Sequence, residues 1–266
     1  MTSTLRRAAA FALVATLALG APLLGAAAPV PFLLVALLAA ATTSGPLFEL
    51  FARPGDYQEG RLYGLLSFAL AAAGLALLPA FVDLPTGVFV AAVLLVGWGN
   101  LAAVAARRVR RSDIATTAGF AGGAAAAAEV GLIAAPRLAD ASLVADIPAL
   151  AVEAGAATPA PKIVFLAASG ALFAGLLRAV FPGREDPLML VSGAMVLWLL
   201  HALPVVTSWQ GITIALAVTI AFGYVSWALD TASITGMLTG ILLGLVTVVL
   251  GGYDWFVVML PFFGIR

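Results

Sequence analysis

Polar side chains inside long apolar runs are the first candidates for chemistry in this sequence. Glu129 follows five alanines, His201 lies near the end of a later apolar run, and Asn100 follows Gly97 and Gly99. A carboxylate within a membrane segment is typical of a proton or cation site, but one near the interface can also reach water past small neighbours. An amide there can bond to a neighbouring helix, and a lone histidine cannot complete a metal site. We therefore expect structural roles for Asn100 and His201 and keep both interpretations of Glu129.

A second group of candidates is a mixed cluster of charges that follows an apolar run and consists of Glu49, Arg53, Asp56, Glu59 and Arg61. The arginines of such a cluster can hold a phosphate, because a guanidinium group offers paired N–H donors. The alternative, which we expect, is a solvated loop with internal ion pairs.

Signatures of complete active sites are absent from the sequence. It contains no phosphate-binding loop ending in Lys-Ser or Lys-Thr, no His-Glu-x-x-His and no Gly-x-Ser-x-Gly. It also contains no cysteine, which excludes disulfides, thiolate zinc sites and cysteine nucleophiles. The net charge of zero gives no indication of nucleic-acid binding.

The elements that must position these residues are membrane-spanning helices. Hydrophobic residues make up 63% of the 266 residues and charged residues only 10%, with a mean hydropathy of +1.13. So few charges cannot cover a soluble globule of this size. Residues 65–82 and 121–128 are apolar or small at every position, whereas the strands of a membrane barrel alternate apolar and polar residues. The sequence therefore predicts an all-α polytopic membrane protein with nine to ten spanning helices.

Runs of about 20 apolar residues, the length that crosses a bilayer, set the expected positions of these helices. They fall at 8–28, 31–51, 62–82, 88–106, 116–135, 163–181, 188–206, 211–229 and 233–250, with a tenth beginning near 254. The first 28 residues also resemble a secretory signal peptide, because Arg6 and Arg7 precede an apolar run that ends in three alanines.

The basic residues predict the orientation of the chain. With the N-terminus in the cytoplasm, Arg137 and Lys162 alone of the 13 basic residues face outward, and basic loops are retained on the cytoplasmic side. The arginines at 107, 108, 110 and 111 then anchor the topology beside anionic headgroups. We expect an external segment at 136–161 with Asp140, Asp146 and Glu153, either as a surface helix or as a solvated acidic loop.

Glycines recur every four residues in the last long run, at Gly236, Gly240 and Gly244. Their missing side chains predict a seam where another helix approaches closely. From 229 to 263 the chain reads LDTASITGMLTGILLGLVTVVLGGYDWFVVMLPFF. It combines Asp230, this glycine-spaced run, the pair Gly251-Gly252, and Trp255 opening a further apolar run. This order of features resembles the opening of the membrane family called domain of unknown function 92, which includes transmembrane protein 19 and the phytyl-phosphate kinase of plants.

The resemblance implies a kinase-like protein that transfers phosphate from a nucleoside triphosphate with Mg²⁺ to an isoprenoid phosphate. It divides the chain into N-terminal membrane helices, 1–206, and the start of a kinase-like domain, 207–266. Asp230 is the only residue it offers for catalysis, and the family's later charged motifs would follow residue 266, so we expect an incomplete and inactive chain. The alternatives are a small transporter, with Glu129 and Asn100 lining its path, and a non-catalytic membrane scaffold.

Overall fold

The computed structural model of the chain describes residues 2–140, 158–181 and 186–264, and these residues contain helices and no strand. The first half of the chain forms α1 (Thr2–Thr16), α2 (Ala21–Leu24), α3 (Pro29–Ala41), α4 (Pro46–Phe51), α5 (Asp56–Glu59), α6 (Tyr63–Leu77) and α7 (Thr86–Val109). The second half forms α8 (Asp113–Ala139), α9 (Ala160–Val180), α10 (Asp186–Ala202), α11 (Trp209–Ala228), α12 (Ile234–Gly251) and α13 (Tyr253–Gly264). One short 3-10 turn connects α1 to α2 (Leu17–Gly20), a second connects α2 to α3 (Gly25–Ala27), and a third follows α6 (Leu78–Ala80).

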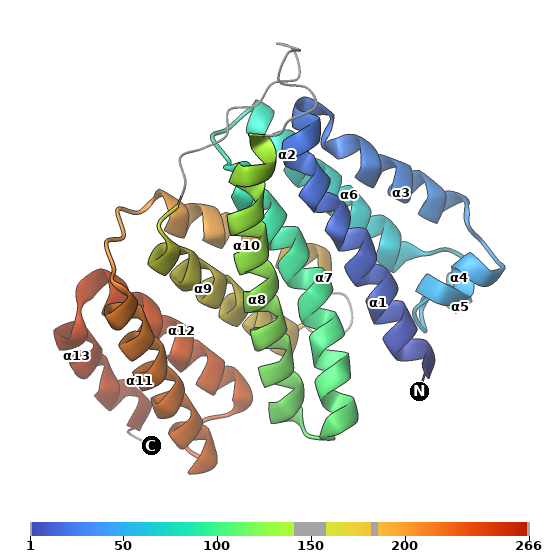
Figure 1. Cartoon of the computed structure of the whole chain (residues 1–266). Coiled ribbons are helices and arrows are strands. Elements are labelled where there is room, and N and C mark those ends of the chain that lie inside the picture. Colours follow the sequence, from blue (N-terminus) through green and yellow to red (C-terminus); the bar gives the residue numbers. More distant parts are fainter. Residues whose placement is uncertain (1, 141–157, 182–185, 265–266) are drawn as a thin grey trace.

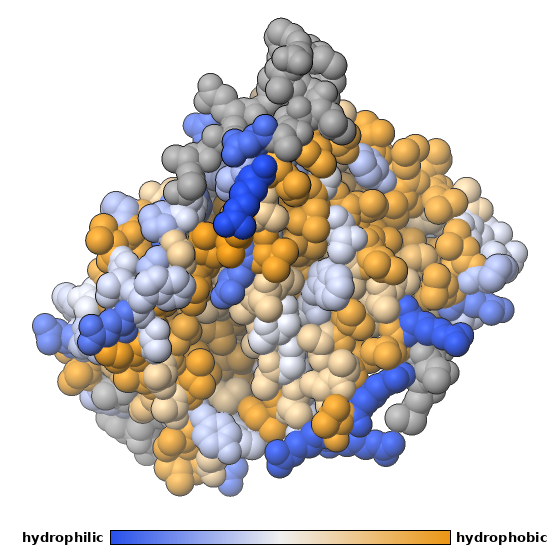
Figure 2. Space-filling model, in the orientation of Figure 1, coloured by the Kyte–Doolittle hydropathy of each residue, from blue (hydrophilic) through white to orange (hydrophobic). Residues whose placement is uncertain are grey.

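The all-α membrane class predicted from composition is confirmed. Seven helical segments of the described residues are long and apolar enough to cross a bilayer, and α3 and α10 are shorter apolar helices. Figure 2 shows a broad apolar surface between hydrophilic groups near its top and along its lower edge. A surface of this kind suits contact with lipid rather than with water.

Helix α7 lies at the centre of the bundle and is buried without interruption from Val88 to Gly97. It packs against α1, α8, α9 and α10, while α3 packs on α6 to one side. Helices α11, α12 and α13 form a group on the other side and join the bundle mainly through the contact of α12 with α9 (Figure 1). The central helix therefore reaches elements from both halves of the sequence.

Helices α7 and α8 form the closest long contact in the bundle, and glycines of α8 make it possible. A Cβ on Gly131 would lie 2.8 Å from the Cα of Ala91, and one on Gly123 would overlap the side chain of Ala102. Close backbone approach gains dispersion energy that a lipid-facing helix cannot obtain from the hydrophobic effect. The sequence predicted a seam at the glycines of α12, and this seam at the glycines of α8 was not predicted.

The prediction of a single helix at 31–51 is wrong. Helix α3 ends at Ala41, and a separate short helix, α4, begins at Pro46. Pro46 disfavours a helical conformation in the residue before it, and Gly45 adopts a φ of +89° that only glycine enters easily. The hydroxyl of Thr42 also donates to the carbonyl of Leu38 at 2.7 Å and competes with continuation of the helix.

The span expected at 8–28 is divided among α1, α2 and two 3-10 turns, and the remaining expected spans coincide with helices of the structure within a few residues. The helix α8 extends further than expected, through Pro136 and Arg137 to Ala139, into the segment 136–161 that was predicted to lie outside. Pro136 has no backbone N–H and so cannot donate to the carbonyl of Leu132, but its own carbonyl still accepts a hydrogen bond from the backbone N–H of Asp140, which continues the helical pattern to the end of α8. Asp146 and Glu153 lie outside the described residues.

Candidate functional site: a basic pocket at one end of the bundle

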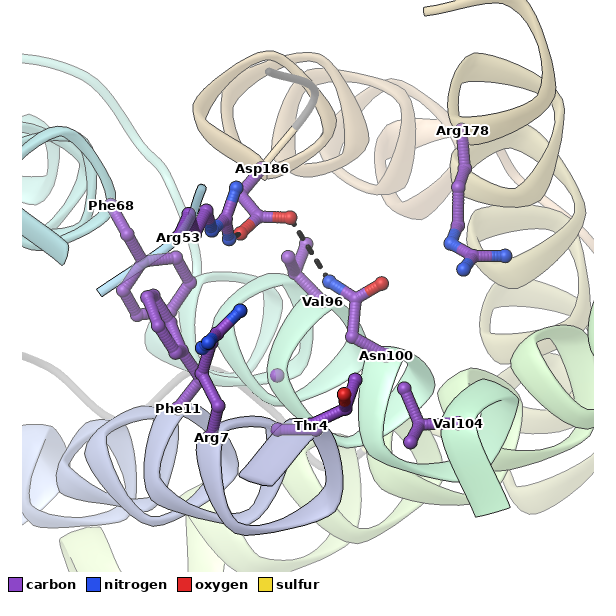
Figure 3. A pocket seen from close by; sticks show the side chains of 12 residues that line it. Thr4, Arg7, Phe11, Arg53, Phe68, Val96, Asn100, Val104, Arg178 and Asp186 are labelled. Atoms are coloured by element: carbon purple, nitrogen blue, oxygen red, sulfur yellow. Dashed lines mark hydrogen bonds and ion pairs between the residues drawn. The ribbon is translucent and has the colours of Figure 1, made fainter. Parts of the chain in front are cut away.

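A pocket of about 150 Å³ lies at the end of the bundle where α1 begins and α7 ends (Figure 3). Its polar lining residues are Thr4, Arg7, Arg53, Asn100, Arg178 and Asp186. Its apolar lining residues are Ala8, Phe11, Phe68, Val96, Gly97 and Val104. The lining therefore combines three guanidinium groups and one carboxylate with an apolar wall.

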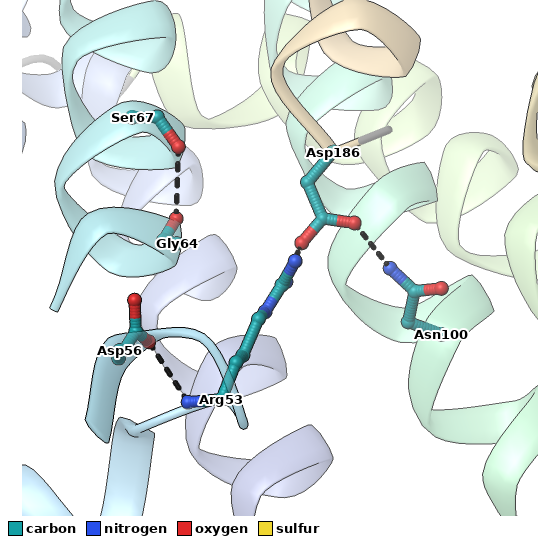
Figure 4. A network of polar contacts seen from close by, with 6 residues as sticks. All are labelled: Arg53, Asp56, Gly64, Ser67, Asn100 and Asp186. Carbon is teal, nitrogen blue, oxygen red and sulfur yellow. Dashed lines mark hydrogen bonds and ion pairs between the residues drawn. The ribbon is translucent and has the colours of Figure 1, made fainter. Parts of the chain in front are cut away.

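Asp186 is the centre of the polar network in this pocket. It is the first residue of α10, and only 3% of its surface is exposed. Its carboxylate accepts a hydrogen bond from the amide of Asn100, with 3.0 Å between Oδ1 and Nδ2, and it pairs with Nη2 of Arg53 (Figure 4). A carboxylate at a helix N-terminus is also stabilised by the backbone dipoles of that helix. The network joins α10, α7 and the turn between α4 and α5.

Arg53 is directed into the pocket by its surroundings. Its backbone N–H donates to the buried carboxylate of Asp56 at 2.8 Å, and the same carboxylate accepts the backbone N–H of Tyr63 at 3.0 Å. Its side chain passes α6 so closely that a Cβ on Gly64 would lie 2.9 Å from Nε. Its guanidinium carbon stands 5.0 Å from the ring centre of Phe11, which is a favourable cation–π distance. The turn after α4, the close approach to Gly64 and the ring of Phe11 together fix the position of the guanidinium group of Arg53.

Arg7 enters the pocket from α1 (Figure 3). Helix α1 can lie close to α7 because Gly97 has no side chain: a Cβ there would stand 3.3 Å from the Cα of Ala12 and overlap the side chain of Ala15. The Nε atom of Arg7 is buried and has no hydrogen-bond partner among the described residues. A buried donor of this kind favours any acceptor that enters the pocket.

This arrangement can bind an anion. Guanidinium groups present planar N–H donors that match the oxygens of phosphate, and they lose less hydration free energy than ammonium groups do. Arg53 has five N–H donors, and among the described residues its guanidinium bonds only to Asp186. Phe11 and Phe68 add an apolar wall against which a hydrocarbon can pack. The chemistry suits a phosphate attached to an apolar group.

Sequence reasoning found part of this site. Asn100 lies in the pocket and bonds to Asp186, a residue of another helix. Arg53 belongs to the charged cluster, but the expectation of an ion pair within that cluster is wrong for its side chain, which pairs with Asp186 instead. Asp186 was missed, and Arg7 and Arg178 were considered only for topology. The one available signal was the dipeptide Asp-Pro at 186–187, which precedes an apolar run and is typical of a helix start.

The structure does not bring Glu129 into the pocket. Gly131 of α8 lies opposite Ala91 of α7, and Gly123 lies opposite Ala102, which fixes how the two helices are aligned. At a rise of 1.5 Å per residue, this alignment separates Glu129 from Asn100 by about 10 Å along the helix axis. Glu129 is half-buried. Asn100 lines this pocket and Glu129 does not.

His201 lies at the opposite end of the bundle in a structural cluster. Its Nε2 is 3.2 Å from the hydroxyl of Thr158, and its backbone carbonyl accepts a hydrogen bond from Lys162 at 2.7 Å. Lys162 also donates to the carbonyl of Leu203 at 2.8 Å. These bonds satisfy carbonyls at the C-terminus of α10 that have no partner within the helix.

The residues that carry the family resemblance lie around α12, away from the pocket. Asp230 is exposed in the turn before α12 and has a φ of +56°. Gly252, with a φ of +88°, turns the chain into α13, and a Cβ on Gly251 would stand 3.2 Å from the ring of Trp255.

The three glycines of α12 differ in their surroundings. A Cβ on Gly244 would lie 2.9 Å from Phe256 and 3.0 Å from Thr219, so α11 and α13 both approach it. Gly240 is buried, whereas a Cβ on Gly236 would meet only atoms of its own helix start. Close approach to other helices therefore involves Gly244 and not Gly236.

No family model, curated protein or solved structure matches the chain.

Proposed function

We propose that this membrane protein binds an isoprenoid phosphate, with the phosphate in the basic pocket and the hydrocarbon chain directed toward the bilayer. The observation that carries the proposal is a pocket lined by three arginines, Arg7, Arg53 and Arg178, together with Asn100, Thr4, one carboxylate and an apolar wall. The resemblance of the segment 229–263 supports the isoprenoid class of the ligand, while the pocket chemistry supports the phosphate.

We place the pocket at the cytoplasmic face of the cell membrane. Its three arginines come from the beginning of α1, the turn after α4 and the last turn of α9, and basic segments are retained on the cytoplasmic side. A ligand with a charged head and an apolar tail would find water and headgroups on one side of this pocket and hydrocarbon on the other.

A nucleoside triphosphate and Mg²⁺ do not fit this pocket. About 150 Å³ is smaller than the roughly 300–1,000 Å³ of ordinary small-molecule sites, and a triphosphate with its nucleoside needs more room than a single phosphate. Both oxygens of Asp186 already accept bonds from Arg53 and Asn100. The described residues also hold no group of three or more His, Cys, Asp or Glu that could bind a metal ion. The proposed function therefore stops at binding of the lipid phosphate.

The test compares two ligands that differ only in the phosphate. Isothermal titration of the purified chain in a nonionic detergent should show binding of geranylgeranyl phosphate and much weaker binding of geranylgeraniol. Arg7→Gln should weaken phosphate binding about 10- to 100-fold, because a hydrogen bond to a charged group contributes about 1.5–3 kcal/mol.

Arg111→Gln is the matched control, since Arg111 is exposed at the same end of the bundle and does not line the pocket. This variant should bind like the wild type. Equal affinity for the phosphate and the alcohol, or an equal loss in both variants, would contradict the proposal and favour a non-catalytic scaffold.

A further inference from the structure

The apolar side of the pocket lies deeper in the bundle than the polar groups beside it. Phe11 follows Arg7 by four residues on α1, and Val96 precedes Asn100 by four residues on α7. Because α1 begins and α7 ends at this face of the bundle, each apolar residue lies about 6 Å further from the face than its polar neighbour, at 1.5 Å per residue. A phosphate beside the polar groups would therefore have an attached hydrocarbon beside the apolar ones.

Two phenylalanine rings form this deeper wall. Phe11 of α1 and Phe68 of α6 pack edge to face, with 6.1 Å between the ring centres, and both are buried. Figure 3 shows the two rings next to each other, on the opposite side of the pocket from Arg178. The rings therefore occupy the boundary between α1 and α6.

Other helix boundaries around the pocket are closed by tight packing at glycines. A Cβ on Gly97 of α7 would stand 3.3 Å from the backbone of α1, and one on Gly99 would stand 2.9 Å from side chains of α8. A Cβ on Gly170 of α9 would stand 2.8 Å from a side chain of α10. Where even one methyl group does not fit, a hydrocarbon chain cannot pass unless the helices move apart.

The boundary between α1 and α6 is different. Among the described residues these two helices have little backbone contact, and the rings of Phe11 and Phe68 fill the space between them. A side chain can change its rotamer without moving its helix. Both helices also reach the surface of the bundle near this depth, where Leu13 of α1 is 65% exposed and Leu70 of α6 is 49% exposed. A passage between α1 and α6 would thus open to the bilayer.

We propose that the hydrocarbon chain of the ligand leaves the pocket between α1 and α6, in contact with the rings of Phe11 and Phe68. This inference rests on the proposed function and names the residues that receive the apolar part of its ligand. The two rings then determine the preference for a long chain, while the arginines hold the phosphate.

The experiment compares methyl phosphate with hexadecyl phosphate, which carry the same charged group and differ in the chain. Isothermal titration in a nonionic detergent should show that the wild type binds hexadecyl phosphate at least about tenfold more tightly, because only the long chain buries apolar surface on the rings. Phe68→Ala should lower the affinity for hexadecyl phosphate about tenfold, since truncation of a buried aromatic contact commonly has an effect of this size. Its affinity for methyl phosphate should stay within about twofold of the wild type.

Phe89→Ala is the matched control. Phe89 is as buried as Phe68 and packs edge to face on Phe32, also with 6.1 Å between the ring centres, but it does not line the pocket. Removal of either ring leaves a comparable cavity in the bundle. Phe89→Ala should therefore keep the preference of the wild type for the long chain.

Photolabelling locates the chain without any variant. Hexadecyl phosphate with a diazirine group in the first third of its chain should label α1 and α6 of the wild type, and excess hexadecyl phosphate should suppress this labelling. Suppressible labelling confined to other helices would overturn the inference.

The outcomes separate the two proposals. Equal affinity of the wild type for both phosphates, or an equal loss of the preference in Phe68→Ala and Phe89→Ala, would overturn the role of the rings while leaving phosphate binding intact. A wild type that binds neither phosphate would overturn both proposals.

Discussion

The ion pair between Arg53 and Asp186 predicts an asymmetric response to its removal. The side chain of Asp186 is 4% exposed and that of Arg53 is 27% exposed. Arg53→Gln leaves a buried carboxylate with only the amide of Asn100, and an uncompensated buried charge costs about 3–5 kcal/mol. Asp186→Asn leaves a guanidinium that can still reach water, so we expect a loss of only about 1–2 kcal/mol.

The double variant Arg53→Gln/Asp186→Asn should be about as stable as Asp186→Asn alone, because no buried charge is left without a partner. The two single changes should therefore be non-additive, with an interaction energy as large as the loss in Arg53→Gln, roughly 3–5 kcal/mol. Arg61→Gln is the control, since Arg61 belongs to the same charged cluster but is exposed between α5 and α6, and the loss on its replacement should stay within about 0.5 kcal/mol.

Thermal unfolding of the purified variants in one detergent provides the assay. For a chain of this size, 1 kcal/mol corresponds to roughly 2–4 °C, so Arg53→Gln should lower the Tm by about 10 °C. A smaller loss for Arg53→Gln than for Asp186→Asn would refute the reasoning from burial. Additive effects in the double variant would show that the two side chains do not stabilise each other.

Two further predictions concern packing and orientation. Gly131→Leu should destabilise the chain by about 3 kcal/mol or more, because overpacking forces α8 away from α7. The control is Gly122→Leu on the same helix, where a Cβ would meet nothing within 4 Å, and this variant should have little effect on the Tm. The variants Ser112→Cys and Ser208→Cys each replace a helix N-cap, and the two N-caps lie at opposite ends of the bundle. In intact cells an impermeant thiol reagent should label the cysteine at 208 and spare the one at 112. The reverse labelling pattern would invert the proposed orientation.

The helices could be predicted from the sequence because a bilayer demands a long apolar run for each crossing, and such runs are visible without any knowledge of contacts. The break between α3 and α4 was missed because apolar residues flank it on both sides, although Gly45 and Pro46 are typical of a helix end. The apolar composition of the whole run led to the prediction of one helix, although Gly45 and Pro46 indicate a break.

The site could be predicted only where a residue is unusual in its own segment. Asn100 stands out as an amide in an apolar helix, and it lies in the pocket. Asp186 is ordinary as the first residue of a helix, and its partner Arg53 is 133 residues away. One sequence carries no information about a pair at that separation. The same holds for the seam of α8, since the glycines at 119, 123 and 131 matter only because alanines of α7 oppose them.

Helix association in a bilayer draws on close backbone contact and polar bonds, because lipid removes most of the hydrophobic gain. This protein uses the first along α7, where Gly97 and the glycines of α8 admit neighbouring helices, and the second at one end, where Asp186 ties α10 to α7 and to the turn after α4. The arginine that completes this tie also faces the pocket. An anion bound in the pocket as we propose would take Arg53 from Asp186 and weaken one of the bonds that hold α10, so the proposed ligand binding and the helix packing would depend on the same side chain.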